Sequence, residues 1–390
     1  MDVAEAAAVS ELRPYAMVAG GDAIARAPDG RVVFVTGALP DELVRVEVTG
    51  RAQDYLRAHA VEVIEASPAR VDASCPEFGR GCGGCQWQHI AVADQRTFKR
   101  KVIEDVLRRT ARLEAPTIEP VVELPATGYR TTLRAGVVQG RAGYRQRRQH
   151  HIVAVGSCEV AHPLVEDLLL HGDYGDADEV VLRCGARTGE RMAMTDPPGA
   201  RMTIPDDARR AHVHEVVAGR TWRISGPSFF QSRPDGADAL AALVAAAAAD
   251  VRPGGAVDLY SGVGLFAGVL ADRGWSVTAV ESSKVAVGDA RANLRKADVD
   301  VVRADVLKWR PPAADLVIAN PSRQGLGKRG VATAVATGAR RVVLVSCDVG
   351  AFGRDAGLLH AAGYRLASVT PVDLFPHTFH VEVVSVIDRA

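Results

Sequence analysis

The sequence predicts an α/β protein whose C-terminal part is a Rossmann-like, doubly wound and mostly parallel sheet. Two observations support this prediction. From Pro227 onward, short β-branched runs alternate with helical stretches, and a glycine-rich turn follows the first of these runs. The N-terminal part differs, because turn residues rather than helices separate its short strand-like runs. With 390 residues, of which 47% are apolar, the chain is long enough for two or three globular domains.

Three domains are expected. Residues 8–66 predict a small β-barrel of the oligonucleotide-binding type, with strands at 32–35, 43–48 and 59–64. Residues 67–226 predict a small β-rich central domain with a Cys/Gly-rich loop and an amphipathic helix at about 91–113, a candidate to pack on the C-terminal domain. Residues 227–390 predict the doubly wound domain. Its helix is expected at 237–250 and its strands at 256–260, 276–281, 299–303, 315–319 and 341–345.

Charge and hydropathy exclude some classes of protein. The formal net charge is zero, which argues against a uniformly basic surface for nucleic acid but allows local basic patches. No apolar run is long enough to span a bilayer, and the segment from Met1 to Glu5 lacks the features of a secretory signal. We therefore expect a cytoplasmic monomer without membrane contact. Thiols stay reduced in that compartment, so clustered cysteines require a reason other than disulfides.

Three cysteines lie on one glycine-rich loop, at Cys75, Cys82 and Cys85. Such a set indicates a metal site, and Cys158 is the best candidate for a fourth ligand, with Cys184 as the alternative. Four thiolates suit zinc or an iron–sulfur cluster. The three-plus-one spacing favours the cluster, because zinc sites more often show two paired CxxC units.

A basic stretch covers residues 124–158, which contain no acidic residue. Guanidinium groups bind phosphates and aromatic rings stack on unpaired bases, so this stretch favours contact with nucleic acid over a merely solvated strand face. Its positive and aromatic residues are Arg130, Arg134, Arg141, Arg145, Arg147, Arg148, His150, His151, Tyr129 and Tyr144.

A nucleotide-cofactor pattern spans residues 258–264, where Tyr260 and Gly262 follow a predicted strand and precede a helix. Glu281, at the end of the next strand, is placed to accept both ribose hydroxyls, and Asp305 could pair with an adenine amino group. Glycine spacing alone does not exclude NAD. The element that begins at Asn320-Pro321 favours S-adenosylmethionine, because methyltransferases use a similar element to hold a planar base edge.

Cys347 and Glu382 are the candidate catalytic pair. Cys347 ends a predicted buried strand, and Glu382 lies in the last strand of the chain. Each residue alone would more often be structural, the cysteine as a small buried side chain and the glutamate at a sheet edge. Together with a methyl-donor site they predict methylation of a pyrimidine ring carbon through a covalent enzyme adduct.

Four motifs carry a family resemblance: residues 20–40, 82–89, 228–231 and 375–382. On these motifs the chain resembles, over nearly its whole length, the RNA uridine-5-methyltransferases that carry a TRAM domain and an iron–sulfur cluster. The resemblance implies that a 4Fe-4S cluster is bound by Cys75, Cys82, Cys85 and Cys158. It also implies RNA as the substrate, with 23S rRNA expected rather than tRNA.

The resemblance further implies residue roles. Cys347 would be the nucleophile and Glu382 the base, and Phe229 could stack on the flipped uracil. The pocket for cofactor and target base would be lined by Gln231, Tyr260, Glu281 and Asn320.

Three positions depart from the family pattern: Asn320-Pro321-Ser322-Arg323 replaces Asp-Pro-Pro-Arg, Asp348-Val349 replaces Asn-Pro, and Ser232-Arg233 replaces Val-Asn. Two alternatives therefore stay open, a catalytically weak or silent RNA-binding protein and a cytosine-5 RNA methyltransferase. A radical methylthio-transferase is excluded, because the chain lacks a CxxxCxxC motif.

Overall fold

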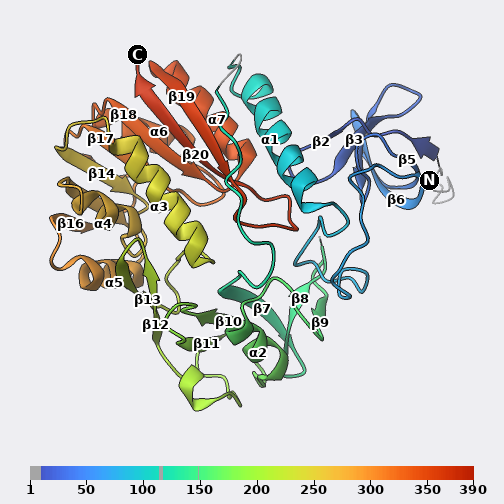
Figure 1. Ribbon diagram of the computed structural model, residues 1–390, viewed down its shortest axis with the longest axis horizontal. Coiled ribbons are helices and arrows are strands. Elements are labelled where there is room, and N and C mark those ends of the chain that lie inside the picture. The colour runs from blue at the N-terminus through green and yellow to red at the C-terminus, as the bar shows by residue number, and fades with distance from the viewer. Residues whose placement is uncertain (1–9, 114–116, 148) are drawn as a thin grey trace.

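The computed structural model describes residues 10–113, 117–147 and 149–390. The segment from Met1 to Glu5 and Arg148, both considered above, lie outside the described residues, as do the first residues of the expected 8–66 domain. Figure 1 shows an N-terminal sheet at the right, a central sheet below and a C-terminal sheet with its helices at the left. Helix α1 (Val92–Arg109) lies between the N-terminal and C-terminal parts.

The N-terminal sheet has six strands in the order β1-β5-β6-β4-β3-β2. Buried and outward-facing residues alternate along β4 and along the first half of β6, which gives this part its own apolar core. The three predicted strands are confirmed, although β6 begins earlier than expected. The strands are β1 (Ser10–Leu12), β2 (Ala16–Met17), β3 (Ala23–Arg26), β4 (Val32–Thr36), β5 (Leu43–Arg51) and β6 (Tyr55–Glu65).

The central part is a five-stranded antiparallel sheet, in the order β11-β10-β7-β8-β9, followed by the β12–β13 hairpin. Helix α2 (Pro163–His171) contacts this sheet and buries Val165, Leu168 and Leu169. The strands are β7 (Thr132–Val138), β8 (Arg141–Arg145), β9 (Ile152–Ala154), β10 (Glu179–Cys184), β11 (Arg191–Asp196), β12 (His212–Val217) and β13 (Arg220–Ser225), with a 3-10 turn η1 (Asp206–Ala208).

The C-terminal sheet has the order β16-β15-β14-β17-β18-β20-β19, in which the first five strands are parallel and β20 is antiparallel to both neighbours. This confirms the predicted doubly wound fold. Its strands are β14 (Gly255–Leu259), β15 (Ser276–Glu281), β16 (Val299–Arg303), β17 (Leu316–Ala319), β18 (Arg341–Ser346), β19 (Tyr364–Val372) and β20 (Glu382–Arg389). Its helices are α3 (Pro234–Ala248), α4 (Leu265–Ala271), α5 (Lys284–Leu294), α6 (Gly327–Ala336) and α7 (Val349–Ala361).

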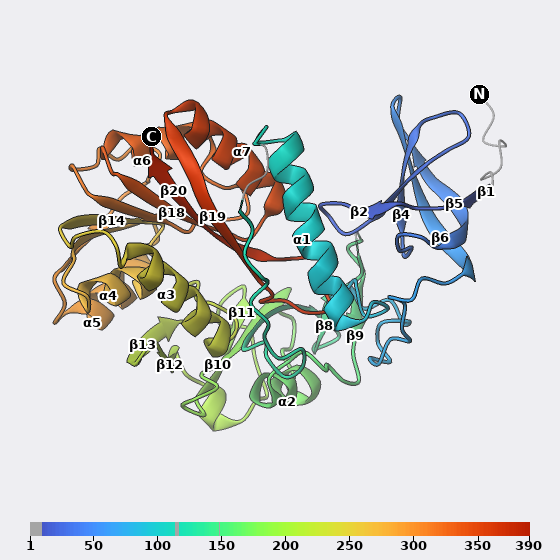
Figure 2. The same cartoon turned by 45° about the horizontal axis from the view of Figure 1, so that its top comes forward.

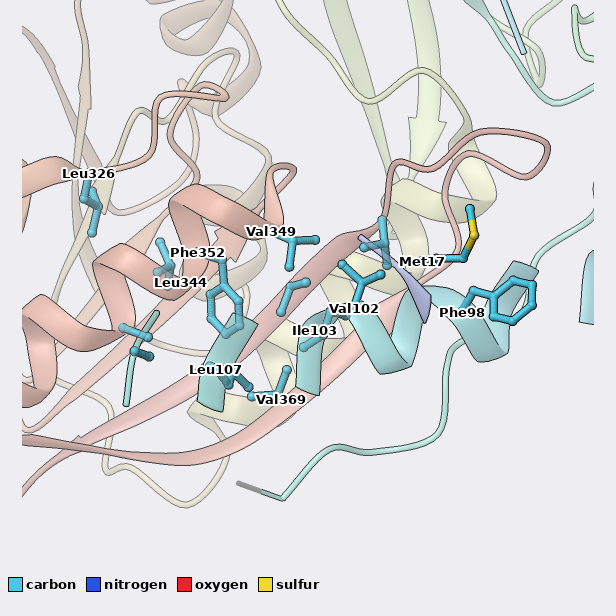
Figure 3. Close-up of a cluster of buried hydrophobic side chains, with 14 of the residues drawn as sticks. Met17, Phe98, Val102, Ile103, Leu107, Leu326, Leu344, Val349, Phe352 and Val369 are labelled. Carbon is cyan, nitrogen blue, oxygen red and sulfur yellow. The ribbon is translucent and has the colours of Figure 1, made fainter. Parts of the chain in front are cut away.

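Helix α1 packs against α7 of the C-terminal part, and Figure 3 shows Val102, Ile103 and Leu107 directed toward Phe352 and its neighbours. The two helices approach closely at Gly353, where a Cβ would lie 2.3 Å from a side-chain carbon of Val106. The helix ends at Arg109 and not at about 113 as expected: Thr110 is its C-cap, with a backbone that is still helical, and Arg112, with φ 56°, turns the chain away from the helical path. Within the described residues, no helix is both long and apolar enough to cross a membrane.

The connection between β19 and β20, residues 373–381, is held by α1. The buried Lys99 ammonium donates to Asp373 Oδ1 at 2.6 Å and to the Phe375 carbonyl at 3.0 Å. Gln95 Oε1 accepts from the His377 amide at 2.7 Å. Because Glu382 is the first residue of β20, these contacts fix the segment that leads directly into it. In Figure 2 this connection passes close to α1, on its way toward the central part.

Candidate active site

One cavity of about 760 Å³ brings together most of the predicted cofactor and catalytic residues. Its position follows from the fold, because the carboxyl ends of parallel strands meet at one edge of the sheet. The predicted residues that line it are Gln231, Tyr260, Gly262, Glu281, Asn320, Cys347 and Glu382. Asp305 does not line this cavity; its carboxylate accepts from the Leu307 amide at 3.0 Å and stabilises the turn after β16.

At one end of the cavity the backbone after β14 adopts left-handed conformations. Tyr260 has φ 62° and Gly262 has φ 56°, and the first of these is unusual for a residue with a side chain. Glu281 accepts from the Gly262 amide at 3.1 Å through one oxygen and from the Ser283 amide at 2.7 Å through the other. A carboxylate that two backbone amides hold beside a glycine turn suits the hydroxyl groups of a nucleoside.

Cys347 and Glu382 lie on neighbouring antiparallel strands. Ser346 of β18 pairs with Val383 of β20, so Cys347 and Glu382 extend from the same end of this strand pair. Burial raises the pKa of Glu382 to about 8. Burial, followed by the charge of Glu382, raises the pKa of the Cys347 thiol to about 11, and the Arg323 guanidinium opposes that rise. The pair therefore combines a thiol that ionises only at high pH with a carboxyl group that is a weaker acid than usual.

The segment before α3 forms the mouth of the cavity. Asp289 of α5 is fully buried and accepts from the Ser228 hydroxyl at 2.6 Å and from the Ser225 amide at 2.9 Å. These bonds anchor the segment that carries Phe229 and Gln231. The Phe229 side chain lines the cavity and is 64% exposed, so it is available to a ligand that enters from solvent.

The structure accounts for two of the three departures from the family pattern. Asp348 caps α7, because its Oδ1 accepts from the Ala351 amide at 2.8 Å. Arg233 is almost fully buried, pairs with Asp235 at 2.7 Å and lies 4.5 Å from the centre of the Tyr129 ring. Its guanidinium also donates to the Leu374 carbonyl at 3.2 Å, so it links the central part to the β19–β20 connection.

The four predicted metal ligands line a second, much smaller cavity, together with Gln88 and Tyr144. Burial raises the pKa of Cys82 to about 11, and the neighbouring Cys158 and Cys75 add to that rise. Gln88 Nε2 is buried beside them without a hydrogen-bond partner among the described residues. The alternative ligand, Cys184, does not line this cavity and lies 3.5 Å from His162 Nδ1.

Within residues 10–113, 117–147 and 149–390, no three His, Cys, Asp or Glu side chains are gathered closely enough to hold a single ion. The four cysteines nevertheless line one cavity, which makes them the candidate ligands of a metal group.

Three arginines of the basic stretch pair with acids from outside it. Arg134 and Arg145 line the cavity, but both pair with Glu179, at 2.7 and 2.6 Å. Glu179 belongs to β10, which lies beside β7 in the sheet. Arg147 pairs with Asp22 of the N-terminal sheet at 3.0 Å. The sequence contains no acid within the stretch, yet the fold brings acids from elsewhere to it.

Two further cavity residues had no cofactor or catalytic role predicted from the sequence: Arg130, which was named only in the basic stretch, and His380. Arg130 lies 5.9 Å from the centre of the Phe375 ring, between this cavity and the cysteines. Although burial opposes it, the nearby Tyr129, Tyr144 and cysteine side chains raise the pKa of Arg130. His380 also lines the cavity, and burial, reinforced by Arg323, lowers its pKa to about 4. In the sequence, the signals that involve these residues are the basic stretch 124–158, which contains Arg130, and the motif 375–382, which contains His380.

The chain matches two known domain families. The TRAM domain family matches residues 18–61, and the methyltransferase small domain family matches residues 225–344. The chain is 32% identical to the 23S rRNA (uracil(1939)-C(5))-methyltransferase RlmD of Chromohalobacter salexigens, over 95% of this chain and 87% of that protein. It belongs to the TRAM-domain RNA uridine-5-methyltransferase family.

Other relatives agree with this family. An uncharacterized RNA methyltransferase of Streptomyces avermitilis is 36% identical, over 95% of this chain and 96% of that protein. The fold is similar to that of the Pyrococcus abyssi tRNA (uracil-54, C5)-methyltransferase, solved with S-adenosyl-L-homocysteine, with a TM-score of 0.74 and 24% identity over 96% of this chain and all of that one. As a family member the chain is an RNA methyltransferase.

Proposed function

We propose that this enzyme transfers a methyl group from S-adenosylmethionine to C5 of a uridine in structured RNA, with 23S rRNA as the preferred class of substrate. The observation that carries the proposal is the placement of Cys347 and Glu382 at the same end of two neighbouring strands, in a cavity shared with Tyr260 and Glu281. The RlmD relatives are named for 23S rRNA, which favours that substrate over tRNA.

The proposed reaction uses one nucleophile and one base. Uracil C5 is a weak nucleophile, so the Cys347 thiolate first adds to C6 and places electron density on C5. S-adenosylmethionine supplies an electrophilic methyl group and leaves as S-adenosylhomocysteine. Glu382 then removes the C5 proton, the Cys347–C6 bond breaks, and the thiolate is regenerated. Because the cavity lies within the protein, the target base must leave its stack to reach Cys347.

Asn320 is the proposed reader of the base edge. It lines the cavity with Cys347, and its amide can donate to uracil O4 and accept from N3–H. The same amide, turned by half a rotation, could accept from the amino group of cytosine. A cytosine-5 activity is therefore the alternative outcome of the experiment below.

S-adenosylmethionine would be held at the Tyr260 end of the cavity. Glu281 is the proposed acceptor for the ribose hydroxyls, and Gly262 allows close approach of the ligand to the backbone. Gln231, which is buried in the mouth segment, and Asn320 lie along the same wall. We do not assign Asp305 to this site, since its carboxylate is used within its own turn.

The RNA contact is proposed to extend onto the N-terminal sheet. The guanidinium of Arg57 lies 5.6 Å from the centre of the Phe34 ring and 5.7 Å from that of Tyr55. Tyr55 is 38% exposed and the Arg57 side chain 44%, so these three residues form an accessible stacking surface. Asp22 joins Arg57 to Arg147, which connects this surface to the basic stretch.

A 4Fe-4S cluster is the proposed metal group of Cys75, Cys82, Cys85 and Cys158. The shared cavity, the thiol donor set and Gln88 Nε2, which is buried without a hydrogen-bond partner among the described residues, support this proposal. When bound, the cluster would tie the cysteine loop to the central sheet. The loop in turn contacts the β19–β20 connection, because the amides of Gln86 and Trp87 both donate to the His377 carbonyl at 2.9 Å.

The decisive experiment is mass spectrometry of nucleosides from ribosomal and transfer RNA, with and without the gene, and with the gene carrying Cys347→Ser. Loss of 5-methyluridine from 23S rRNA that wild-type protein restores and Cys347→Ser does not would support the proposal. Cys184→Ser is the matched control, since Cys184 lines neither cavity. Loss of 5-methylcytidine would indicate the base-switched enzyme, and no change in any methylated nucleoside would leave only a silent RNA-binding protein.

A further inference from the structure

A turn of the TRAM sheet reaches the catalytic part of the molecule. The turn joins β2 to β3 and is closed by hydrogen bonds from the Gly21 amide to the Val18 carbonyl and from the Val18 amide to the Asp22 carbonyl, both 3.0 Å. Gly21 has φ +83°, a conformation that a residue with a side chain rarely adopts. The turn is thus sharp, and its tip is formed by backbone rather than by side chains.

Gly21 lies directly against Phe379. A Cβ at Gly21 would lie 2.6 Å from Phe379 Cδ1 and 2.8 Å from its Cβ and Cγ, all well inside normal contact. The turn is also held from its other side, because the buried Trp87 indole donates to the Gly21 carbonyl at 3.1 Å. Two independent features therefore require glycine at position 21: its backbone conformation and the space that Phe379 occupies.

Phe379 in turn contacts a wall residue of the active site. Its ring centre lies 4.2 Å from that of His380, which lines the large cavity with Cys347 and Glu382. A further small cavity of about 30 Å³, distinct from the cysteine cavity, lies behind Cys347. It is lined by Cys347, Phe379 and His380 together with Val18 and Gly20 of the turn. The TRAM sheet thus contributes part of the packing behind the nucleophile.

We infer that Gly21 is a positioning residue for the methyl-transfer reaction: its contact with Phe379 sets His380 and the segment that leads into Glu382. This inference rests on the proposed function. It gives the TRAM domain a role in the arrangement of the catalytic pocket, beyond contact with RNA. If Phe379 moved to relieve a clash with a Cβ at Gly21, His380 would move relative to Cys347. Small displacements of groups in an active site lower the reaction rate strongly.

The test compares Gly21→Ala with Gly30→Ala. Gly30 lies in the same sheet at φ +86°, but a Cβ there would meet nothing within 4 Å, so the control carries the same backbone strain without the contact. We expect Gly21→Ala to lower kcat by about 10- to 100-fold with little change in KM for RNA. Gly30→Ala should stay close to wild type in both. Hydrogen exchange of residues 378–382 should rise in Gly21→Ala alone.

A double-mutant cycle with Phe379 keeps the test informative if Gly21→Ala folds poorly. Phe379→Gly removes all three atoms with which the new Cβ would collide, whereas Phe379→Ala would leave the Phe379 Cβ at 2.8 Å. Gly21→Ala should therefore cost little more in the Phe379→Gly background. Equal losses from Gly21→Ala in both backgrounds, or a rise in KM for RNA with kcat unchanged, would overturn the inference. An inactive wild-type enzyme would overturn the proposed function instead, and hydrogen exchange would still report on the contact.

Discussion

Glu382 opposes the ionisation of Cys347. Both line one cavity from the same end of strands β18 and β20, and the charge of Glu382 is, after burial, the largest contribution that raises the pKa of the Cys347 thiol. Burial also raises the pKa of Glu382, to about 8. The carboxyl therefore loses its proton before the thiol does. Near neutral pH both groups are therefore mostly protonated.

The first prediction concerns the pH dependence of turnover. As the proposed base, Glu382 must be ionised to accept the C5 proton, and its ionised fraction increases as pH rises through about 8. The thiolate fraction of Cys347 rises over the same range, because its pKa is higher still, at about 11. We therefore expect kcat to rise between pH 6 and pH 9, by at least about tenfold per pH unit below the pKa of the base. Initial rates at saturating RNA and methyl donor measure this profile. A kcat that is flat from pH 6 to pH 9 would contradict the assignment.

The second prediction concerns stability. The folded-state pKa of Glu382 lies above its ordinary value of 4.5, so between pH 4.5 and pH 8 the folded protein keeps a proton that the unfolded chain has lost. Stability contributed by this group therefore falls as pH rises through that window. Glu382→Gln resembles the protonated acid and should be more stable than wild type above pH 8, by up to about 4 kcal/mol, but not at pH 4.

Denaturant unfolding at pH 4, 6 and 8.5 measures this difference in the free energy of unfolding. Glu159→Gln serves as the control, because Glu159 lies at the edge of the cysteine cavity, away from the catalytic pair. A Glu382→Gln variant that is less stable than wild type at pH 8.5 would show that the carboxylate has a stabilising partner.

The third prediction concerns RNA binding by the TRAM sheet. Tyr55→Ala removes the more exposed ring of the stacking surface, and a stacked base contributes about 1–3 kcal/mol, so affinity for RNA should fall about 5- to 100-fold. At saturating RNA, kcat should be unchanged. Tyr15→Ala is the control, since Tyr15 is 50% exposed in the same domain but lines a groove against α1. Equal affinities of the two variants for RNA in a filter-binding assay would show that this surface does not contact RNA.

The sequence identified the strand ends that carry the site, because buried β-branched runs and a glycine turn are local signals. β15 and β16 have the predicted bounds. Tyr260 and Glu281 end predicted strands, and Asn320 and Cys347 come just after predicted strands. It could not show that Glu179 would neutralise Arg134, because that pair depends on which strands become neighbours.

The roles of the residues that depart from the family pattern could not be predicted from the sequence, for the same reason. Asp348 is a helix cap, a role that the sequence allows but that becomes visible only once α7 is seen to begin at the next residue. Arg233 is buried by partners from Tyr129 and Leu374, which lie more than a hundred residues away in the chain. Contacts of this kind have no local signal, and for that reason the sequence named Arg130 only as part of the basic stretch and gave no role to His380.

The fourth prediction concerns the cysteines. Cys85→Ser should lose the visible absorbance and most of the bound iron of protein purified without oxygen, because one of four ligands is removed. Cys184→Ser should retain both, since Cys184 lies outside the cavity. Iron and sulfide analysis together with electron paramagnetic resonance would distinguish a cluster from a single ion. Stoichiometric zinc and no iron in wild-type protein would contradict the cluster.

The fifth prediction concerns the buried ion pair that holds the β19–β20 connection. Lys99 and Asp373 are both fully buried and lie 2.6 Å apart, and burial lowers the pKa of Lys99 although the charge of Asp373 opposes that shift. Lys99→Met leaves Asp373 with only Arg96 as a cationic partner, at 3.2 Å, and also removes the bond to the Phe375 carbonyl. Breaking a buried pair in this way costs about 3–5 kcal/mol.

The measurement for Lys99→Met is the free energy of unfolding, with Lys101→Met as the control on the same helix, where the side chain is exposed. A simultaneous Lys99→Met, Asp373→Leu change should recover part of the loss, because it leaves no uncompensated charge in the interior. Turnover should nevertheless stay low in the double variant, since the Phe375 carbonyl has still lost its donor and the connection leads into Glu382. Full recovery of turnover together with stability would mean that the connection needs no polar anchor from α1 to hold Glu382 in place.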